Sequence, residues 1–112
     1  SVTLKNINAH DGDGEIQFSR IVEREATHGP CNFIDLAILP PGASIGYHQH
    51  SDNEEEFYLV LSGEGLMTRN GESFRVKNGD LIRNPKSGIH GLLNDGPGEL
   101  KIFVFALAVN NV

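Results

Sequence analysis

Two histidines separated by one residue, His48 and His50, precede three consecutive glutamates at 54–56 in GASIGYHQHSDNEEEFYLVLSGEG. Side chains two positions apart in a β-strand point to the same face, so these imidazoles can converge on one point. A third histidine, His90, follows a turn, a short apolar run and a proline in GDLIRNPKSGIHGLLN. Neutral imidazoles with one carboxylate suit divalent first-row transition metals. The residue types therefore predict a metal site, although an isolated His-x-His pair is weak evidence.

The elements that would position these residues are short β-strands. Thirteen glycines and five prolines interrupt the chain, and the runs between them are rich in Val, Ile, Leu and Phe and too short for helices. Strands are predicted at residues 15–22, 32–39, 45–50, 56–63, 64–69, 72–76, 80–83, 89–94 and 100–109. This pattern indicates an all-β sandwich or barrel.

Two local features of the predicted strands carry further expectations. Asn70 and Gly71 predict a type I′ hairpin turn, because both central residues of that turn take positive φ. The last strand, IFVFALAV, has no polar alternation, so we expect both of its faces to be covered, by a second subunit, a helix or a loop.

Length and charge limit the classes of function. The 112 residues have the length of one domain, so a single domain over residues 1–112 is expected. The net charge of -6 argues against nucleic acid, since phosphate backbones are bound by basic surfaces. No stretch approaches the roughly 20 apolar residues that cross a bilayer, which favours a cytoplasmic protein without membrane contact. We expect the single cysteine, Cys31, to be buried and unreactive.

Two segments of the chain resemble the signature motifs of the cupin superfamily, in its small single-domain form. The first motif, over residues 42–63, is matched in spacing by Gly42, His48, His50 and Gly63. The second motif, over residues 79–94, is matched by Gly79, Pro85, His90 and Asn94. At the position of the second motif's inner glycine stands Ser87, and the glycine follows at 88, which leaves the local turn in doubt.

The resemblance implies a double-stranded β-helix, a jelly-roll barrel with a metal inside, and a homodimer that packs strands across subunits. It also implies one divalent metal per chain, Mn, Fe, Ni, Co, Cu or Zn, held by His48, His50, His90 and Glu56. The ligands alone do not identify the metal. Because histidine binds metal only when deprotonated, the metal is predicted to be lost below about pH 6.

Which of the neighbouring glutamates supplies the carboxylate of this ligand set is left open by the spacing. Counting forward from the histidine pair selects Glu54 or Glu55, and counting back from the closing glycine of the motif selects Glu56. Strand register is rigid whereas a loop absorbs an extra residue, so we favour Glu56, with Tyr58 on the same face. Glu55 would then point away, and Glu54 would be a solvated loop residue.

Several polar residues near the motifs are assigned smaller roles. Tyr58 is the candidate for a pocket hydroxyl and, with Glu56, for a catalytic role, whereas Tyr47 on the opposite strand face is expected to pack. Arg83 is a candidate for anchoring an anionic substrate, although an exposed arginine at a strand end is the simpler account. Asn94 is expected to be structural or to support the ligands from behind.

Outside the motifs, the chain offers no further candidate for the site. His10 and His28 are expected at the surface, and HDGDGE at 10–15 is expected to be a solvated turn, because it lacks the complete ligand pattern of a calcium loop.

The predicted function is that of a small metal-dependent enzyme whose substrate chelates through oxygen atoms. Four protein ligands leave two octahedral positions open, which suits a dioxygenase or redox-neutral lyase, isomerase or decarboxylase chemistry. In the redox-neutral class, Glu56 or a bound hydroxide would move the proton. The alternative is a non-catalytic small-molecule or sugar-binding or sensing module with a structural metal, since the fold alone does not choose between these functions.

Overall fold

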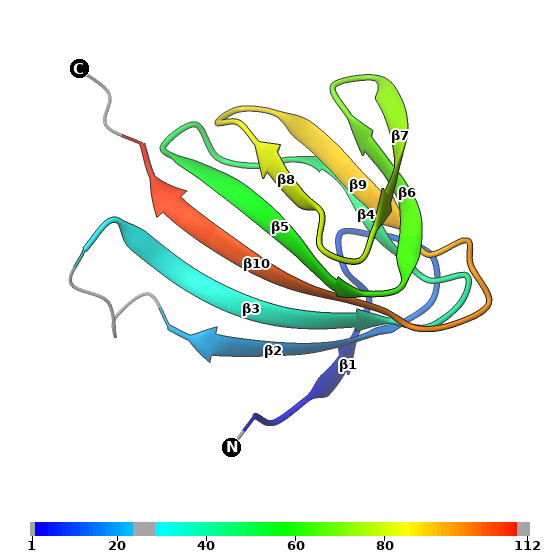
Figure 1. The fold of residues 1–112 in the computed structure, drawn as a ribbon. Helices are drawn as coiled ribbons and strands as arrows, with labels where there is room; N and C mark the ends of the chain where they lie inside the picture. Colours follow the sequence, from blue (N-terminus) through cyan, green and yellow to red (C-terminus); the bar gives the residue numbers. More distant parts are fainter. Residues whose placement is uncertain (1, 24–28, 110–112) are drawn as a thin grey trace.

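The computed structural model describes residues 2–23 and 29–109, which form two facing antiparallel β-sheets and no helix (Figure 1). The strands are β1 (Lys5–Ile7), β2 (Ile16–Val22), β3 (Cys31–Leu39), β4 (Ser44–Gln49), β5 (Glu54–Ser62), β6 (Glu64–Arg69), β7 (Glu72–Lys77), β8 (Leu81–Asn84), β9 (Ile89–Leu93) and β10 (Leu100–Ala108). One sheet has the order β1-β2-β3-β10-β5-β8 and the other β4-β9-β6-β7. The predicted all-β jelly-roll class is confirmed.

The predicted strands all occur, with bounds that differ from expectation by no more than two residues. The prediction missed β1, whose three residues are too few and too exposed to show an alternating pattern. This strand pairs with β2 at the edge of the larger sheet, with Lys5 opposite Phe18. The described residues contain no helix long and apolar enough to cross a membrane.

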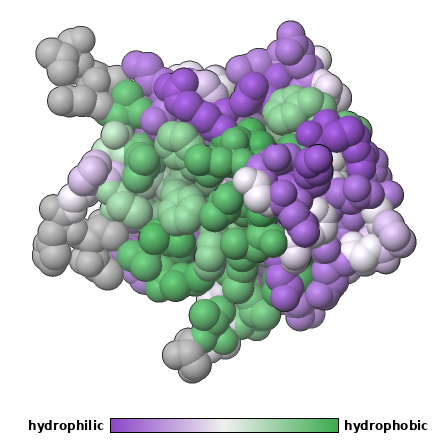
Figure 2. Space-filling view, in the orientation of Figure 1, coloured by the Kyte–Doolittle hydropathy of each residue, from purple (hydrophilic) through white to green (hydrophobic). Residues whose placement is uncertain are grey.

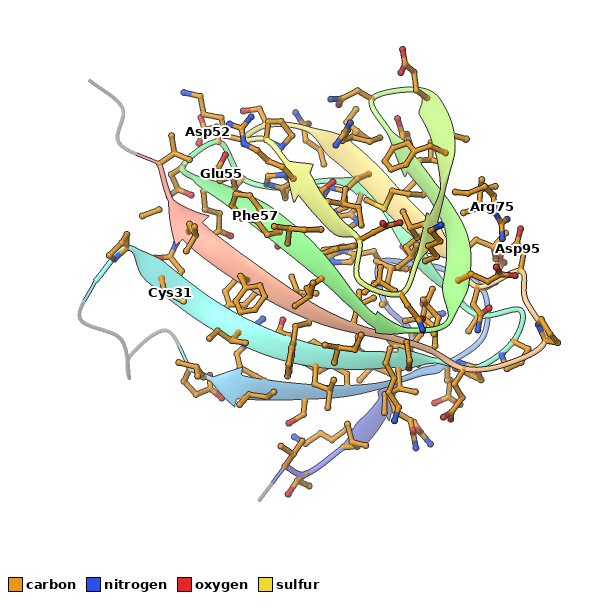
Figure 3. All side chains as sticks on the ribbon, viewed as in Figure 1. Cys31, Asp52, Glu55, Phe57, Arg75 and Asp95 are labelled. Atoms are coloured by element: carbon orange, nitrogen blue, oxygen red, sulfur yellow. The ribbon has the colours of Figure 1, made fainter. Side chains whose placement is uncertain are left out.

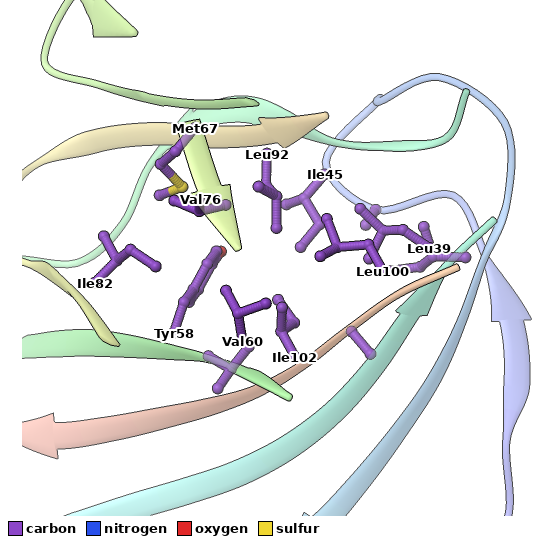
Figure 4. Packing of buried hydrophobic residues seen from close by; sticks show 14 of the residues in the cluster. Leu39, Ile45, Tyr58, Val60, Met67, Val76, Ile82, Leu92, Leu100 and Ile102 are labelled. Atoms are coloured by element: carbon purple, nitrogen blue, oxygen red, sulfur yellow. The ribbon is translucent and has the colours of Figure 1, made fainter. Parts of the chain in front are cut away.

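An apolar core fills the space between the sheets (Figure 4). The larger sheet contributes Leu39, Val60, Leu100 and Ile102, and the smaller sheet contributes Ile45, Met67 and Leu92, all nearly inaccessible to solvent. On β10 every second residue from Leu100 to Ala106 is buried, as the two-residue period of a strand requires. Removing this apolar surface from water is the main force that holds the sheets together.

The outward face of the larger sheet is apolar as well. Cross-strand register aligns Leu36, Phe103 and Leu59 in one row, and Ile34, Phe105 and Phe57 in the next. These side chains are only half-buried, and Figure 2 shows hydrophobic residues gathered over this face. We expected both faces of β10 to be covered. Within the described residues, its inner face is covered by the core and its outward face is not.

Two turns explain how short strands return within the sheets. At the β6–β7 hairpin Asn70 and Gly71 have φ of 49° and 84°, so the predicted type I′ geometry is confirmed. Before β9, Ser87 takes φ of 61° and the amide of Gly88 donates to the carbonyl of Pro85 at 3.1 Å. The second motif has its inner glycine one position late, at Gly88, which had left this turn in doubt. The turn forms nevertheless, with Ser87 in the left-handed region.

A one-residue irregularity in β4 sets the face of its histidine. The register with β9 pairs Ile45 with Leu92 but His48 with His90, so β4 holds one extra residue between these pairs. Such a bulge reverses the alternation, which lets Ile45 and His48 both point inward although they are three positions apart. The bulge includes Gly46, whose amide donates to the carbonyl of Ala9 at 3.0 Å.

Of three expectations about single segments, one holds, one needs correction and one lies outside the structure. Residues 10–15 form an exposed turn, as expected, which is also tied to β4, because the amide of Asp13 donates to the Ser44 hydroxyl at 2.7 Å. Cys31 is half-buried rather than buried, because it starts β3 at the open end of the sheet. His28 falls outside the described residues.

Candidate metal site

The two sheets bring three of the predicted residues together inside the fold. His48 on β4 and His90 on β9 are directly paired in the smaller sheet, and Glu56 lies on β5 of the larger sheet. One ligand atom from each of these residues falls within 4.8 Å of the others, so the group can hold a metal ion. The strands meet here because the core packing of both sheets holds β5 against β4 and β9.

His90 is at the centre of the cluster and is fully buried. Its Nε2 atom lies 3.3 Å from Oε1 of Glu56 and 3.1 Å from the hydroxyl of Tyr58. The Tyr58 ring meets the His90 ring edge-on, with centroids 5.3 Å apart. A carboxylate and a phenol therefore approach the same imidazole nitrogen from β5.

His50 lies beside this group but outside the closest set of ligand atoms. Its ring centroid is 5.0 Å from that of His90. Both of its ring nitrogens are buried and have no hydrogen-bond partner within the structure. Buried polar atoms are almost always paired, so these nitrogens point to a partner that the chain itself does not supply.

The tautomer of His48 follows from one hydrogen bond. Its Nδ1 atom lies 2.7 Å from the carbonyl of Gly46, and because a carbonyl only accepts, Nδ1 carries the proton. Nε2 is then the nitrogen with a free lone pair, as metal coordination requires. The ring of His10 stacks on that of His48 at 3.4 Å with 4° between the planes. His10 is exposed, as expected, yet it forms part of the wall of the site.

Charge states in the cluster follow from burial and from neighbouring charges. Burial disfavours the charged form of His48 and lowers its pKa to about 4. For Glu56, burial raises the pKa, but the hydrogen bond with His90 and the nearby histidines lower it below the usual value. Burial raises the pKa of Tyr58 well above its usual value. A neutral imidazole, an ionised carboxylate and a protonated phenol therefore meet at neutral pH.

The three glutamates have three different surroundings. Glu56 faces the histidines, whereas Glu55 projects to the outside and pairs with Arg83 at 2.8 Å. The side chains of Glu55 and Phe57 can be followed on β5 in Figure 3. The expectation of a solvated loop for Glu54 is wrong: it is 5% exposed, and its Oε2 accepts from Nδ2 of Asn32 at 2.7 Å. β5 begins at Glu54 because pairing with β10 extends that far.

The cupin domain family model matches residues 35–106 of the chain, which is more than half of its length. The chain belongs to the cupin family. The resemblance inferred from its two motifs is thereby confirmed.

Sequences and structures similar to this cupin include one sequence and one crystal structure from Thermotoga maritima. An oxalate-binding protein of that organism is 33% identical over 94 residues, which cover 84% of this chain and 77% of that protein. A crystal structure described as a predicted oxalate decarboxylase superposes with a TM-score of 0.91 at 30% identity, covering 97% of this chain and 95% of the other. An uncharacterized protein of Methanocaldococcus jannaschii is 44% identical over 66 residues, 59% of this chain and 52% of that protein.

The donor set of this cupin fits a divalent transition metal. Imidazole nitrogens and one carboxylate oxygen are ligands that such metals accept. The buried ring nitrogens without partners belong to His50 and to Nδ1 of His90, in the same interior as the cluster. A cation beside them would offset the cost of burying an ionised carboxylate among neutral rings.

A cavity of about 470 Å³ opens onto the site of this cupin. His48, His50, Glu56 and Tyr58 line it, and so do Arg20 and Asp35, which lie in the same row of the larger sheet as Tyr58. Arg20 binds the buried Asp35 through two hydrogen bonds of 2.7 and 3.1 Å, and its guanidinium lies over the Phe33 ring at 4.0 Å.

Sequence reasoning missed the Arg20–Asp35 pair. The signal was Asp35 itself, a lone charge within the apolar run NFIDLAIL, since a charge inside a buried strand requires a partner. Burial holds the pKa of Asp35 above its usual value, and the hydrogen bond with Arg20 acts in the opposite direction.

Three further sequence candidates of this cupin lie away from the cavity lining. Asn94 is structural: its Nδ2 donates to the carbonyls of Leu39 and Gly98, both at 2.8 Å. Arg83 is exposed and paired with Glu55, so it does not face the site. Tyr47 was expected to pack, but it is 52% exposed and its hydroxyl accepts from the amide of Gly71 at 2.9 Å. The bulge in β4 turns this side chain to the outside of an edge strand.

Proposed function

We propose that this cupin binds one divalent transition metal through His48, His50, Glu56 and His90 and uses it to bind a small molecule that chelates through oxygen atoms. The observation that carries the proposal is the convergence of two histidines and one carboxylate within 4.8 Å of one another. The partnerless ring nitrogens of His50 support its inclusion as a fourth ligand. When bound, such a metal acts as a Lewis acid toward oxygen ligands.

The ligand class that we propose is a small carboxylate such as oxalate. Support comes from the Thermotoga maritima matches, a sequence described as an oxalate-binding protein and a crystal structure described as that of a predicted oxalate decarboxylase. The cavity of about 470 Å³ offers ample room, and Arg20 contributes a cation to its wall. Three of the five guanidinium N–H groups of Arg20 remain beyond the two that Asp35 accepts.

In the enzyme form of this proposal, two side chains of β5 act on the bound molecule. Tyr58 stays protonated because of its raised pKa, so its hydroxyl can donate a hydrogen bond to an oxygen that gains negative charge. Glu56 is ionised and can accept a proton while it lies beside His90. Both dioxygenase chemistry and redox-neutral decarboxylase, lyase or isomerase chemistry are compatible with these roles.

The competing proposal is a non-catalytic module in which a metal only holds its ligand. The description of the Thermotoga maritima relative as a binding protein, rather than as an enzyme, favours this alternative. Metal and ligand binding are common to both proposals, and turnover separates them.

The decisive experiment measures metal content, ligand binding and turnover in that order. Purified protein is analysed for bound metal, stripped with a chelator, reloaded with Mn²⁺ and titrated with oxalate by calorimetry. Oxygen uptake and the release of carbon dioxide are then followed with oxalate, catechols, β-diketones and keto acids. Turnover that His50→Ala abolishes supports the enzyme, and binding without turnover on the whole panel supports the module. Protein that binds no transition metal contradicts both.

We also propose that two copies of this cupin associate through the outward face of β3, β10 and β5. The support is the pair of apolar rows containing Phe103 and Phe105, which are only half-buried in one chain. Contiguous apolar surface of this kind is typical of interfaces between subunits.

A further inference from the structure

Asn84, the last residue of β8, is, like His50, a described residue whose side-chain polar atoms are all buried and unpaired. It is fully buried, and neither its amide nitrogen nor its amide oxygen has a hydrogen-bond partner. A buried amide without partners is unfavourable, because the chain loses its bonds to water and gains none in return. A side chain of this kind therefore needs a partner, and none of the described residues bonds to it.

The position of Asn84 is defined by the pairing of β8 with β5. In that register Asn84 lies directly opposite Glu56, and the next inward pair is Ile82 with Tyr58. Burial confirms that Asn84, Ile82 and Tyr58 all face the interior. Directly opposed residues in a sheet have Cβ atoms roughly 4.5–5.5 Å apart, so side-chain rotation alone can bring the amide of Asn84 to the carboxylate of Glu56.

The carboxylate has two oxygens, and in the structure Oε1 is the one that lies against His90. If Glu56 uses one oxygen for a metal ion, the other becomes an acceptor on the side of its strand neighbour. The amide nitrogen of Asn84 is a donor without an acceptor. Asn84 thus offers a hydrogen-bond donor, and the second carboxylate oxygen of Glu56 offers an acceptor.

We infer that Asn84 positions Glu56 for metal binding, by donating a hydrogen bond from Nδ2 to the carboxylate oxygen that does not bind the metal, directly or through one buried water. The inference rests on the proposed metal site and adds a residue that lies within the second motif but is not one of its matched positions. Groups that orient a ligating carboxylate typically contribute about 10–100-fold to metal affinity. Asn84 is a positioning residue in this account, since it touches neither the metal nor the substrate.

The test uses Asn84→Leu, which keeps the branching of the side chain and removes both polar atoms. Mn²⁺ affinity is measured by competition with a chromogenic chelator, and thermal unfolding is measured on the chelator-stripped protein. We expect Mn²⁺ to bind roughly 10–100-fold more weakly. The metal-free variant should unfold at a temperature higher by about 4–8 °C, because the unpaired amide is gone. Opposite effects on affinity and on stability would not arise from damaged packing.

Matched controls keep the result interpretable. Ile82→Leu alters the neighbouring inward side chain of the same strand and should leave Mn²⁺ affinity unchanged. Asn84→Ala is the second variant, for use if the larger leucine prevents folding. It should weaken Mn²⁺ binding in the same way. In a Glu56→Ala background the Asn84 substitution should have no further effect on affinity, since its action passes through that carboxylate.

The outcomes separate this inference from the proposed function. Unchanged Mn²⁺ affinity in both Asn84 variants overturns the inference, and so does an equal loss of affinity with and without Glu56. A lower unfolding temperature together with unchanged affinity assigns Asn84 a packing role and also overturns it. Absence of Mn²⁺ binding in the unsubstituted protein overturns the proposed metal site itself, and the inference with it.

Discussion

His48 lies directly opposite His90 across β4 and β9, although β4 carries one extra residue before this pair. The bulge depends on Gly46, because a Cβ at this position would overlap the backbone oxygen of His10. The same residue supplies the carbonyl that orients the His48 ring. Backbone packing at one glycine thus decides where an imidazole of the cluster points.

Gly46→Ala should therefore reduce both stability and metal affinity. We expect the free energy of unfolding to fall by about 1–3 kcal/mol, because the backbone of residues 9–12 must move away from β4. Urea unfolding and Mn²⁺ titration measure the two effects. Gly98→Ala is the matched control, since a Cβ there meets no atom within 4 Å. Equal behaviour of the two variants would contradict the assigned role of Gly46.

Glu56→Gln should weaken metal binding strongly, whereas Glu55→Gln should leave it intact. Glutamine keeps the shape of the side chain but removes the charge that lies 3.3 Å from the His90 imidazole. The loss should exceed the roughly 10–100-fold typical of residues behind the ligands. Glu55 pairs with the exposed Arg83, so its substitution should change the free energy of unfolding by no more than about 1 kcal/mol. Chelator competition with both variants decides; a larger loss for Glu55→Gln would refute the site.

The metal-free protein should lose stability as the pH falls from about 6.5 to about 4. Burial lowers the pKa of His48 to about 4 in the folded chain, so in this range the unfolded chain binds the proton more tightly. The contribution is complete above the usual histidine pKa and disappears as pH approaches 4. Urea unfolding in the presence of a chelator, at steps from pH 7 to pH 4, measures it.

His48→Gln is the control for this pH dependence, since glutamine does not titrate and should flatten the slope. An identical slope in both proteins would show that His48 is not the group responsible. In the metal-loaded protein, the low pKa of His48 means that protons displace the metal from this ligand near pH 4 rather than near pH 6. Metal content after dialysis at each pH measures that shift, and full retention at pH 3 would contradict histidine ligation.

Ser87→Gly should stabilise the protein by about 0.5–1 kcal/mol. At φ of 61° the Cβ of serine is sterically strained, and glycine removes this strain. Glycine also loses more backbone entropy on folding, which offsets part of the gain in stability. Ser87→Ala separates the backbone effect from the hydroxyl group, because it keeps the Cβ and should not stabilise. Thermal unfolding of the three proteins is sufficient, and a destabilised Ser87→Gly variant would argue against the positive φ.

Phe105→Arg should convert the proposed dimer into a monomer. Phe105 lies in the row with Ile34 and Phe57 on the outward face, where a buried charge without a partner would oppose association. Light scattering coupled to size-exclusion chromatography measures the mass. Ile89→Lys, a change at an exposed apolar residue of the smaller sheet, should leave the mass unchanged. A monomeric unsubstituted protein would exclude this interface.

The sequence alone was enough to predict the class of fold and the family, and it pointed to three histidines and one of three glutamates as a candidate site. Short apolar runs between glycines and prolines predicted the strands, and the hairpin at Asn70 and Gly71 followed from local backbone preferences. The spacing of His48 and His50 indicated a shared face because alternation along a strand is a local rule, and the resemblance to the second cupin motif added His90. The strands, the hairpin turn and the shared face of the first two histidines can be predicted from the sequence because each depends on residues only a few positions apart.

Tertiary structure decided which side chains actually meet. The bulge at Gly46, the stacking of His10 on His48 and the burial of Glu54 each depend on a segment distant in the sequence packing against its neighbour. The same is true of Asn84, whose relation to Glu56 exists only through the pairing of β8 with β5. Register between distant strands is set by the packing of the whole core, which no local pattern records.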